Sequence, residues 1–150
     1  MTILQESRDN SIHKWLIIAG RQISQQLDQQ LAMIGLTASN YFYILKIHDN
    51  PGLTQKTLGE TEFIDPSNVT RAVKQLIAQG LIERRPQPQD KRAYQLALTD
   101  KGTAIYPKIF QILDVEEKQL ADAVADQDYD QQLFINALQK IGQLYSDTRR

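Results

Sequence analysis

The sequence predicts a mainly α-helical fold that carries one small β-hairpin, and three observations lead to this fold class. Apolar residues recur at steps of three and four over most of the chain, as they do on one face of a helix. Around residues 81–98 the pattern changes to two short runs typical of strands. With 150 residues, 41% hydrophobic and 23% charged, the chain can form one sizeable core, and wholesale disorder is excluded.

The first three predicted helices occupy the N-terminal 61 residues. The first is long and amphipathic, is closed by Gly35, and has the apolar stripe Ile12, Leu16, Ala19, Ile23, Leu27 and Leu31. Thr37 is expected to cap the second helix, which ends at the breaker cluster 50–52 and has the stripe Tyr41, Ile44, Leu45 and His48. We expect His48 to contact the carbonyl groups at that helix end. Thr54 is expected to cap a short third helix over 55–61.

A fourth helix is predicted to begin at Asp65-Pro66. Aspartate suits the N-cap, and proline suits the first helical position because the N–H that it lacks would be unpaired there. Gly80 supplies the C-terminal stop. The apolar positions of this helix are Val69, Ala72, Val73, Leu76 and Ile77.

The hairpin and two C-terminal helices complete the predicted order. Residues 81–85 and 93–98 are read as strands, and the proline pair in 86–92 is expected to keep the tip out of regular pairing. Thr99 is expected to cap the next helix, with Asp100 at its positive end. Pro107 is expected to lie late in the first turns of this helix or to kink it. Apolar stripes continue over 103–125 and 130–146.

The charge of the chain is distributed unevenly, although the formal net charge is only −1. Residues 66–94 contain six basic and two acidic side chains, a net charge of +4, whereas 111–150 contain eight acidic and four basic side chains, a net charge of −4. A near-neutral total therefore does not exclude a nucleic-acid partner, because one central segment is basic.

Composition and motifs argue against several classes of protein. The chain contains no cysteine, which excludes a disulfide framework, thiolate zinc sites and a cysteine nucleophile. Its two histidines lie in separate predicted helices, and no glycine-rich phosphate loop or Gly-x-Ser-x-Gly motif is present. We therefore expect no enzyme, no metal and no cofactor. Because residues 1–10 include charges and no apolar block, and no apolar run is long enough to span a membrane, a cytoplasmic protein is expected.

The third and fourth predicted helices form the pattern of a helix-turn-helix. Opposite its apolar positions, the fourth helix carries side chains that can donate to base edges or to phosphates. Arginine can bind guanine, and asparagine and glutamine can bind adenine. The candidate DNA-binding residues are Ser67, Asn68, Thr70, Arg71, Lys74 and Gln75. The alternative is an ordinary solvated helix face.

The charged hairpin tip makes DNA binding the stronger interpretation. Asp90, Lys91 and Arg92 follow the fourth helix as the tip of a wing, where an arginine can enter a narrow minor groove and an aspartate can orient it. Thr54 and Lys56, at the start of the third helix, are further candidate DNA contacts.

These motifs together resemble the winged helix-turn-helix core of the MarR family of transcriptional regulators. The resemblance rests on Asp65-Pro66-Ser67-Asn68-Val69-Thr70-Arg71, Leu76, Gly80-Leu81-Ile82-Glu83-Arg84, Asp90-Lys91-Arg92 and Leu98-Thr99-Asp100-Lys101-Gly102, with Leu36-Thr37 and Pro51-Gly52-Leu53-Thr54 upstream. Two positions depart from the family pattern. Gly59 replaces the usual alanine and is expected to loosen the third helix slightly, and Ile77 replaces a frequent glutamate.

The resemblance implies a single domain over 1–150 that is divided by role. A winged-helix DNA-binding lobe is expected at about 36–99, and dimerisation helices at about 10–34 and 100–147. It implies a homodimer on a pseudo-palindromic double-stranded operator, with the fourth helix in the major groove and the wing in the minor groove. Packing of the terminal helices onto their own lobe is the alternative use of their apolar faces.

The resemblance also implies a repressor that a small anionic or aromatic effector releases from DNA. Candidate residues for the effector cleft are Trp15, Arg21, Tyr41, Phe42 and Tyr43, for which core packing is the alternative. The absence of cysteine argues against sensing by thiol oxidation. Two other functions remain open at this stage: a winged-helix protein-interaction module that does not bind DNA, and an enzyme whose site is assembled from scattered residues.

Overall fold

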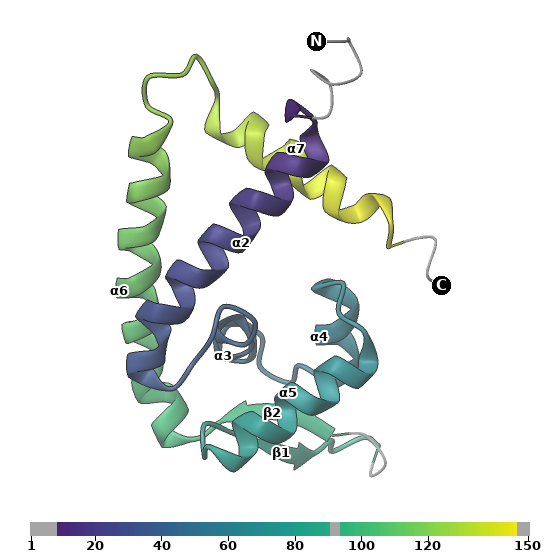
Figure 1. Cartoon of the computed structure of the whole chain (residues 1–150). Helices are drawn as coiled ribbons and strands as arrows, with labels where there is room; N and C mark the ends of the chain where they lie inside the picture. Colours follow the sequence, from purple (N-terminus) through teal and green to yellow (C-terminus); the bar gives the residue numbers. More distant parts are fainter. Residues whose placement is uncertain (1–8, 91–93, 147–150) are drawn as a thin grey trace.

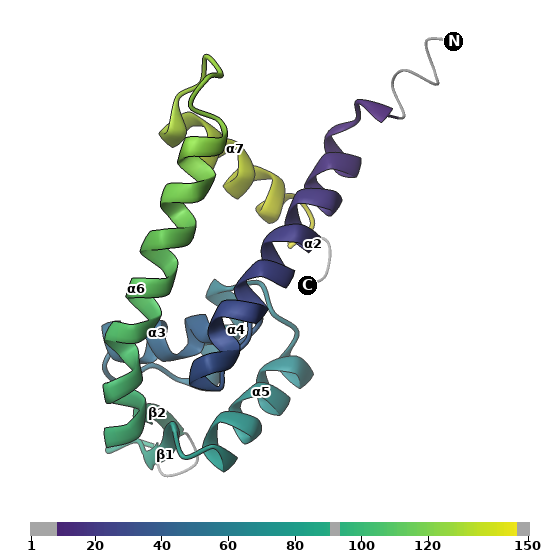
Figure 2. The same ribbon diagram turned by 60° about the vertical axis from the view of Figure 1, so that its left-hand side comes forward.

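The computed structural model describes residues 9–90 and 94–146 as a compact lobe from which long helices extend (Figures 1 and 2). The elements in chain order are α2 (Ile12–Leu31), the 3₁₀ helix η1 (Ala32–Ile34), α3 (Tyr41–Asp49), α4 (Gln55–Thr61), α5 (Pro66–Ala78), β1 (Ile82–Pro86), β2 (Tyr94–Leu98), α6 (Asp100–Ala123) and α7 (Gln131–Leu144). The predicted mainly α-helical fold with one hairpin is confirmed.

The lobe consists of α3, α4, α5 and the β1–β2 hairpin around one apolar core. The strands pair antiparallel, from Ile82 opposite Leu98 to Pro86 opposite Tyr94. Leu53 extends the sheet slightly, because its carbonyl accepts from the Leu96 N–H at 2.8 Å. The buried core side chains include Ile44, Leu58, Val73, Leu76 and Leu96. Burial of these side chains fixes which face of α5 remains in solvent.

Three of the predicted helix starts are confirmed, two by capping hydrogen bonds and one by the position of a proline. The Thr54 side chain accepts from the Thr57 N–H at the start of α4, and that of Thr99 accepts from the Gly102 N–H at the start of α6. Pro66 occupies the first turn of α5. The two threonines each satisfy an N–H that has no partner within the helix, and Pro66 has no N–H to leave unpaired, so these residues mark the helix starts.

The prediction for Thr37 is wrong. The residue opens a turn whose Thr37 carbonyl accepts from the Asn40 and Tyr41 N–H groups, and α3 begins only at Tyr41 with Asn40 at its N-cap. The Asn40 side chain is buried and accepts from the Thr37 N–H at 2.8 Å. A buried side-chain acceptor therefore holds the turn that delays the helix.

The predicted stripe of α3 is also partly wrong. The buried side chains of α3 are Tyr43, Ile44 and Ile47, whereas His48 is exposed. His48 does not contact helix-end carbonyls: its Nδ1 lies 2.9 Å from Asp49 Oδ1, and its ring stacks on that of Tyr106 with 3.6 Å between centroids. Packing against α6, which local sequence does not reveal, selects the buried face.

The structure corrects the prediction for Pro86 and places Pro107 inside a continuous helix. Pro86 does pair, as the last residue of β1 opposite Tyr94, which corrects its assignment to the unpaired tip. A strand end tolerates proline because no further ladder hydrogen bond is needed there. Helix α6 runs on through Pro107 to Ala123, so this proline lies inside the helix and does not end it (Figure 2).

Candidate nucleic-acid interface

Helix α5 presents two chemically distinct faces. Val69, Val73 and Leu76 are buried in the lobe. The opposite face is exposed and carries Ser67, Asn68, Arg71, Lys74 and Gln75. Two cations and two amides therefore lie in solvent on one side of a helix that the core holds in place, as base and phosphate recognition requires.

The side chains of Arg71 and Asn68 form a pair on this face. Arg71 Nη1 donates to Asn68 Oδ1 at 3.3 Å, one helical turn away. The remaining guanidinium N–H groups can still donate to an acceptor outside the protein. The pair limits the freedom of both side chains before any ligand is bound.

Thr70 differs from the other candidate DNA contacts on α5, because its hydroxyl takes part in hydrogen bonds that join α5 to α4. Its hydroxyl accepts from Gln55 Nε2 at 2.9 Å and donates to the Pro66 carbonyl at 3.0 Å. Gln55 Oε1 lies 3.5 Å from Arg84 Nη2 in β1. The local sequence does not predict this role for Gln55 or Arg84, because no local pattern indicates that α4, α5 and β1 meet through them.

The N-terminus of α5 is held by backbone hydrogen bonds and not by a side-chain cap. The Asp65 backbone carbonyl accepts from the Asn68 and Val69 N–H groups, at 3.0 and 3.1 Å. Asp65 occupies the predicted N-cap position, but its carboxylate accepts from the Ser67 hydroxyl and makes no side-chain capping bond. The backbone starts the helix, and Pro66 supplies the required geometry.

The remaining candidate DNA contacts are only partly described. Lys56 is exposed on α4, and the Thr54 hydroxyl is engaged with Thr57 in the cap. Asp90 is exposed near the hairpin tip. Lys91 and Arg92 lie outside the described residues, so their predicted role in the wing stays a prediction.

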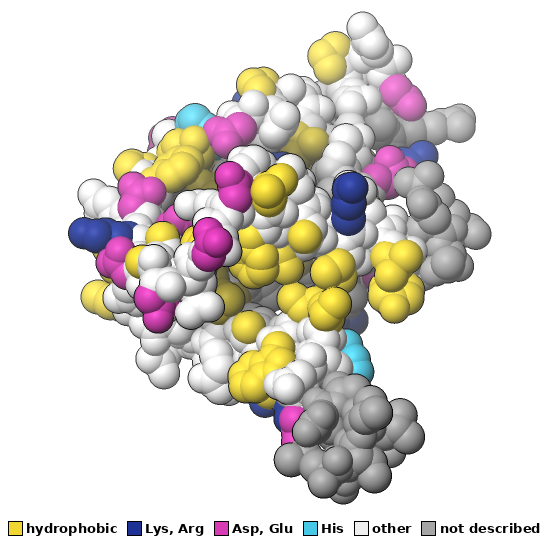
Figure 3. Space-filling model, turned by 90° about the horizontal axis from the view of Figure 1, so that it is seen from above, with side chains coloured by type: hydrophobic (Ala, Val, Ile, Leu, Met, Phe, Trp, Pro, Cys, Tyr) yellow, Lys and Arg dark blue, Asp and Glu magenta, His cyan; other side chains and the backbone are white. Residues whose placement is uncertain are grey.

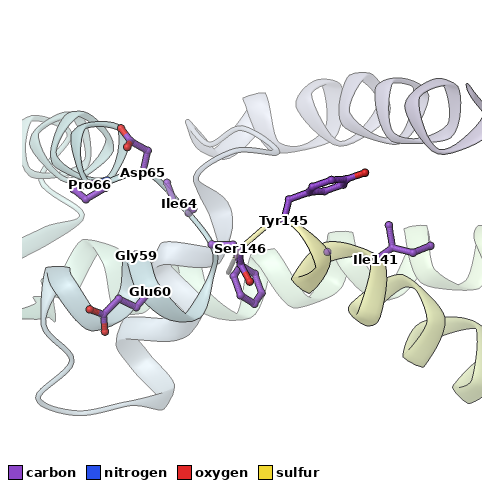
Figure 4. A pocket seen from close by; sticks show the side chains of 10 residues that line it. Gly59, Glu60, Ile64, Asp65, Pro66, Ile141, Tyr145 and Ser146 are labelled. Atoms are coloured by element: carbon purple, nitrogen blue, oxygen red, sulfur yellow. The ribbon is translucent and has the colours of Figure 1, made fainter. Parts of the chain in front are cut away.

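None of the five candidate effector-cleft residues lines the cavity beside the turn between α4 and α5 (Figure 4) or the one between α3 and the hairpin, and their predicted role stays a prediction. The rings of Tyr41, Phe42 and Tyr43 contact one another in sequence, with Tyr43 buried in the core. Burial and, more weakly, Glu62 and Glu117 raise the pKa of Tyr41. Trp15 lies in the first turn of α2, where its Nε1 donates to the Asp9 carbonyl, and Arg21 is exposed further along α2.

Polar contacts join the lobe to the long helices. The Tyr106 hydroxyl on α6 donates to Asp49 Oδ1 at 2.7 Å. Hydrogen bonds from His48 and Tyr106 lower the pKa of Asp49, and the hydrogen bond to Asp49 raises the pKa of Tyr106. These contacts join α3 to α6.

Residues 9–90 and 94–146 contain neither a cluster suited to a metal ion nor a helix suited to crossing a membrane. No cluster of three or more histidine, cysteine, aspartate or glutamate side chains there could hold a metal ion. Among the helices of the same residues, none has the length and apolar character needed to cross a bilayer.

Comparisons with known proteins agree with this architecture. The model of the MarR family matches residues 36–94. The HTH-type transcriptional regulator YybA of Bacillus subtilis (strain 168) is 32% identical over 98 residues, which is 65% of this chain and 65% of that protein. The chain thus aligns with slightly less than two thirds of this relative's length.

Solved structures extend the similarity to nearly the whole chain. The transcriptional regulator SlyA superposes with a TM-score of 0.75 at 25% identity, over 93% of this chain and 96% of that chain. The repressor CouR, solved on a 23-mer DNA duplex, has a TM-score of 0.81 at 23% identity, over 91% and 95%, and at that identity shows the common fold. The relatives are regulators and not enzymes, and the alternative of a protein-interaction module finds no support among them. Residues 36–94 therefore match the MarR family of transcriptional regulators, and the chain shares its winged helix-turn-helix fold with solved transcriptional regulators over more than nine tenths of its length.

Proposed function

We propose that the chain is a homodimeric, sequence-specific regulator that binds a pseudo-palindromic duplex operator, acts as a repressor in the cytoplasm and is released by a small molecule. The observation that carries the proposal is the exposed face of α5, with Arg71, Asn68, Lys74 and Gln75 opposite a fully buried face. In this proposal α5 enters the major groove and the wing follows the minor groove.

The long helices support the homodimer. Helix α7 has no buried residue, although Phe134, Leu138 and Ile141 lie on one face of it. In α2, only Leu27 and Leu31 of the predicted stripe are buried, and Ile12 is 73% exposed. Seen from above, hydrophobic side chains gather across the centre of the surface (Figure 3). Apolar surface of this extent indicates a protein interface, and a second copy with the same faces buries it.

Two substitutions on α5 separate base recognition from phosphate binding. Arg71→Ala should weaken specific binding by about 1 to 3 kcal/mol and leave binding to random duplex largely unchanged, because a base contact is lost. Lys74→Ala should weaken binding to both DNAs and reduce the salt slope by about one unit, because a phosphate contact is lost. Titration of selected and random duplexes at several salt concentrations measures both effects.

The two variants serve as matched controls for each other, since each removes one exposed cation from the same helix. An equal loss on selected and random duplex for Arg71→Ala would exclude its base-reading role. A protein that binds no duplex even at low ionic strength would exclude the proposed function itself.

A further inference from the structure

The guanidinium group of Arg84 is placed beside α5 by a short chain of hydrogen bonds. Arg84 lies in the middle of β1, opposite Leu96 of β2. Paired residues point to the same face of a sheet, and Leu96 is buried, so Arg84 lies on the face of the hairpin that is turned toward the core. Its Nη2 lies 3.5 Å from Gln55 Oε1 of α4, and Gln55 Nε2 donates to the Thr70 hydroxyl of α5 at 2.9 Å. A strand residue is thereby tied to α5, which lies beside the hairpin (Figure 1).

The neighbours of Gln55 fix the orientation of its amide group. The Thr70 hydroxyl uses its one proton to donate to the Pro66 carbonyl at 3.0 Å, so toward Gln55 it can only accept. The guanidinium of Arg84 can only donate. The amide nitrogen of Gln55 therefore faces Thr70 and its amide oxygen faces Arg84. Glutamine supplies the donor and the acceptor that these two positions require.

Arg84 and its neighbour Arg85 differ in how their charges are balanced. Arg85 points to the opposite face of β1, where its Nη2 lies 2.6 Å from Glu83 Oε1. Within the part of the chain that the structure describes, no carboxylate forms an ion pair with Arg84, and its side chain is exposed. The one 3.5 Å contact is long for a hydrogen bond and leaves the other guanidinium N–H groups available. Arg84 can therefore donate to an anion outside the protein.

The position of Arg84 matches the path of a DNA strand in the proposed complex. There α5 occupies the major groove and the wing occupies the minor groove beside it, and a sugar–phosphate backbone separates the two grooves. Gln55 and Thr70 place Arg84 next to α5, and Pro86, the last residue of β1, leads from it into the hairpin tip. A cation between the two groove-binding elements meets phosphates before it meets base edges.

We propose that Arg84 binds a backbone phosphate between the grooves that α5 and the wing enter, and that Gln55 is the positioning residue that holds its guanidinium there. The inference rests on the proposed function and extends the DNA-binding surface from α5 to the strand. Because Gln55 and Thr70 restrict Arg84 before DNA is bound, less side-chain freedom is lost when the complex forms.

Arg84→Gln and Arg85→Gln test the phosphate contact as a matched pair, since each removes one exposed positive charge from the same strand. Arg84→Gln should weaken binding to selected and random duplex alike, by about 3- to 10-fold, and reduce the salt slope by about one unit. Arg85→Gln should leave both nearly unchanged, because Glu83 already balances that charge on the other face. Arg84→Lys should retain the slope, because it keeps the charge.

Titration of both duplexes with the full chain at several salt concentrations measures the affinities and the slopes. The same slope for Arg84→Gln and Arg85→Gln would overturn the phosphate contact while the proposed function stands. Failure of the proposed function is distinct, because the wild type would then bind neither duplex at low ionic strength, and the inference would fall with it.

Gln55→Met tests the positioning role, because methionine has a similar length and lacks the amide. The variant should weaken duplex binding about 3-fold when Arg84 is present and should have no further effect in the Arg84→Gln background, since positioning acts through Arg84. Thermal unfolding without DNA checks that each variant is folded. If Gln55 only supports the packing of α4 on α5, the loss in affinity will be the same in both backgrounds, and this result would overturn its positioning role.

Discussion

Phe134→Glu is expected to convert the dimer to a monomer and to lower operator affinity by at least about 100-fold. Phe134 lies on the apolar face of α7 and is 53% exposed in the single chain, so the fold of one chain does not depend on it. In a dimer that buries this face, the glutamate would have to lose its hydration without a partner, which costs several kcal/mol. Sedimentation or light scattering measures the mass, and titration with the selected duplex measures the affinity.

The matched control is Gln139→Glu. It adds the same charge to the same helix, at an exposed position on the face opposite Phe134. This variant should remain dimeric and bind DNA as the wild type does. Circular dichroism of both variants checks that helicity is retained. A Phe134→Glu protein that stays dimeric would show that α7 packs elsewhere than at the two-fold axis.

Gly102→Ala is expected to destabilise the fold by about 2 to 3 kcal/mol. Gly102 lies in the first turn of α6, where it passes the start of β1. A Cβ there would lie 2.1 Å from the carbonyl oxygen of Leu81, which also accepts from the Thr99 N–H at 3.1 Å. Backbone would have to shift at the point where α6 leaves the lobe, so both stability and the placement of α6 should suffer.

The comparison for this variant is Gly142→Ala in α7. A Cβ at Gly142 meets nothing within 4 Å, so alanine should stabilise the helix by up to about 1 kcal/mol through its higher helix propensity. Thermal unfolding at one fixed protein concentration measures both changes, because dimer formation makes the midpoint depend on concentration. Equal midpoints for the two variants would refute the steric explanation for Gly102.

The parts of the fold that depend on local chemistry could be predicted from the sequence. Thr54, Thr99 and Pro66 mark helix starts because each satisfies or removes an N–H within its own turn. The prediction for Thr37 is wrong because its turn depends on the buried side chain of Asn40. The prediction for His48 is wrong because its ring stacks on Tyr106, which α6 supplies from far along the chain. Such contacts are set by tertiary packing, which a local pattern does not contain.

The candidate site, like the fold, could be predicted from the sequence only in part. The exposed set on α5 follows from helical periodicity once the apolar face is known. The link through Gln55 and Arg84 does not, because it joins residues of α4, α5 and β1 that are separated in sequence.

Selection of bound sites from random duplex DNA by the purified wild-type protein tests the central claim most directly. If a symmetric dimer reads DNA through α5, the selected sequences should form an inverted repeat whose half-site centres lie about 10 to 10.5 base pairs apart. For Arg71→Ala, the preference for the base that Arg71 contacts should fall under the same conditions. No enrichment with the wild type, or an unpaired half-site without two-fold symmetry, would contradict the account.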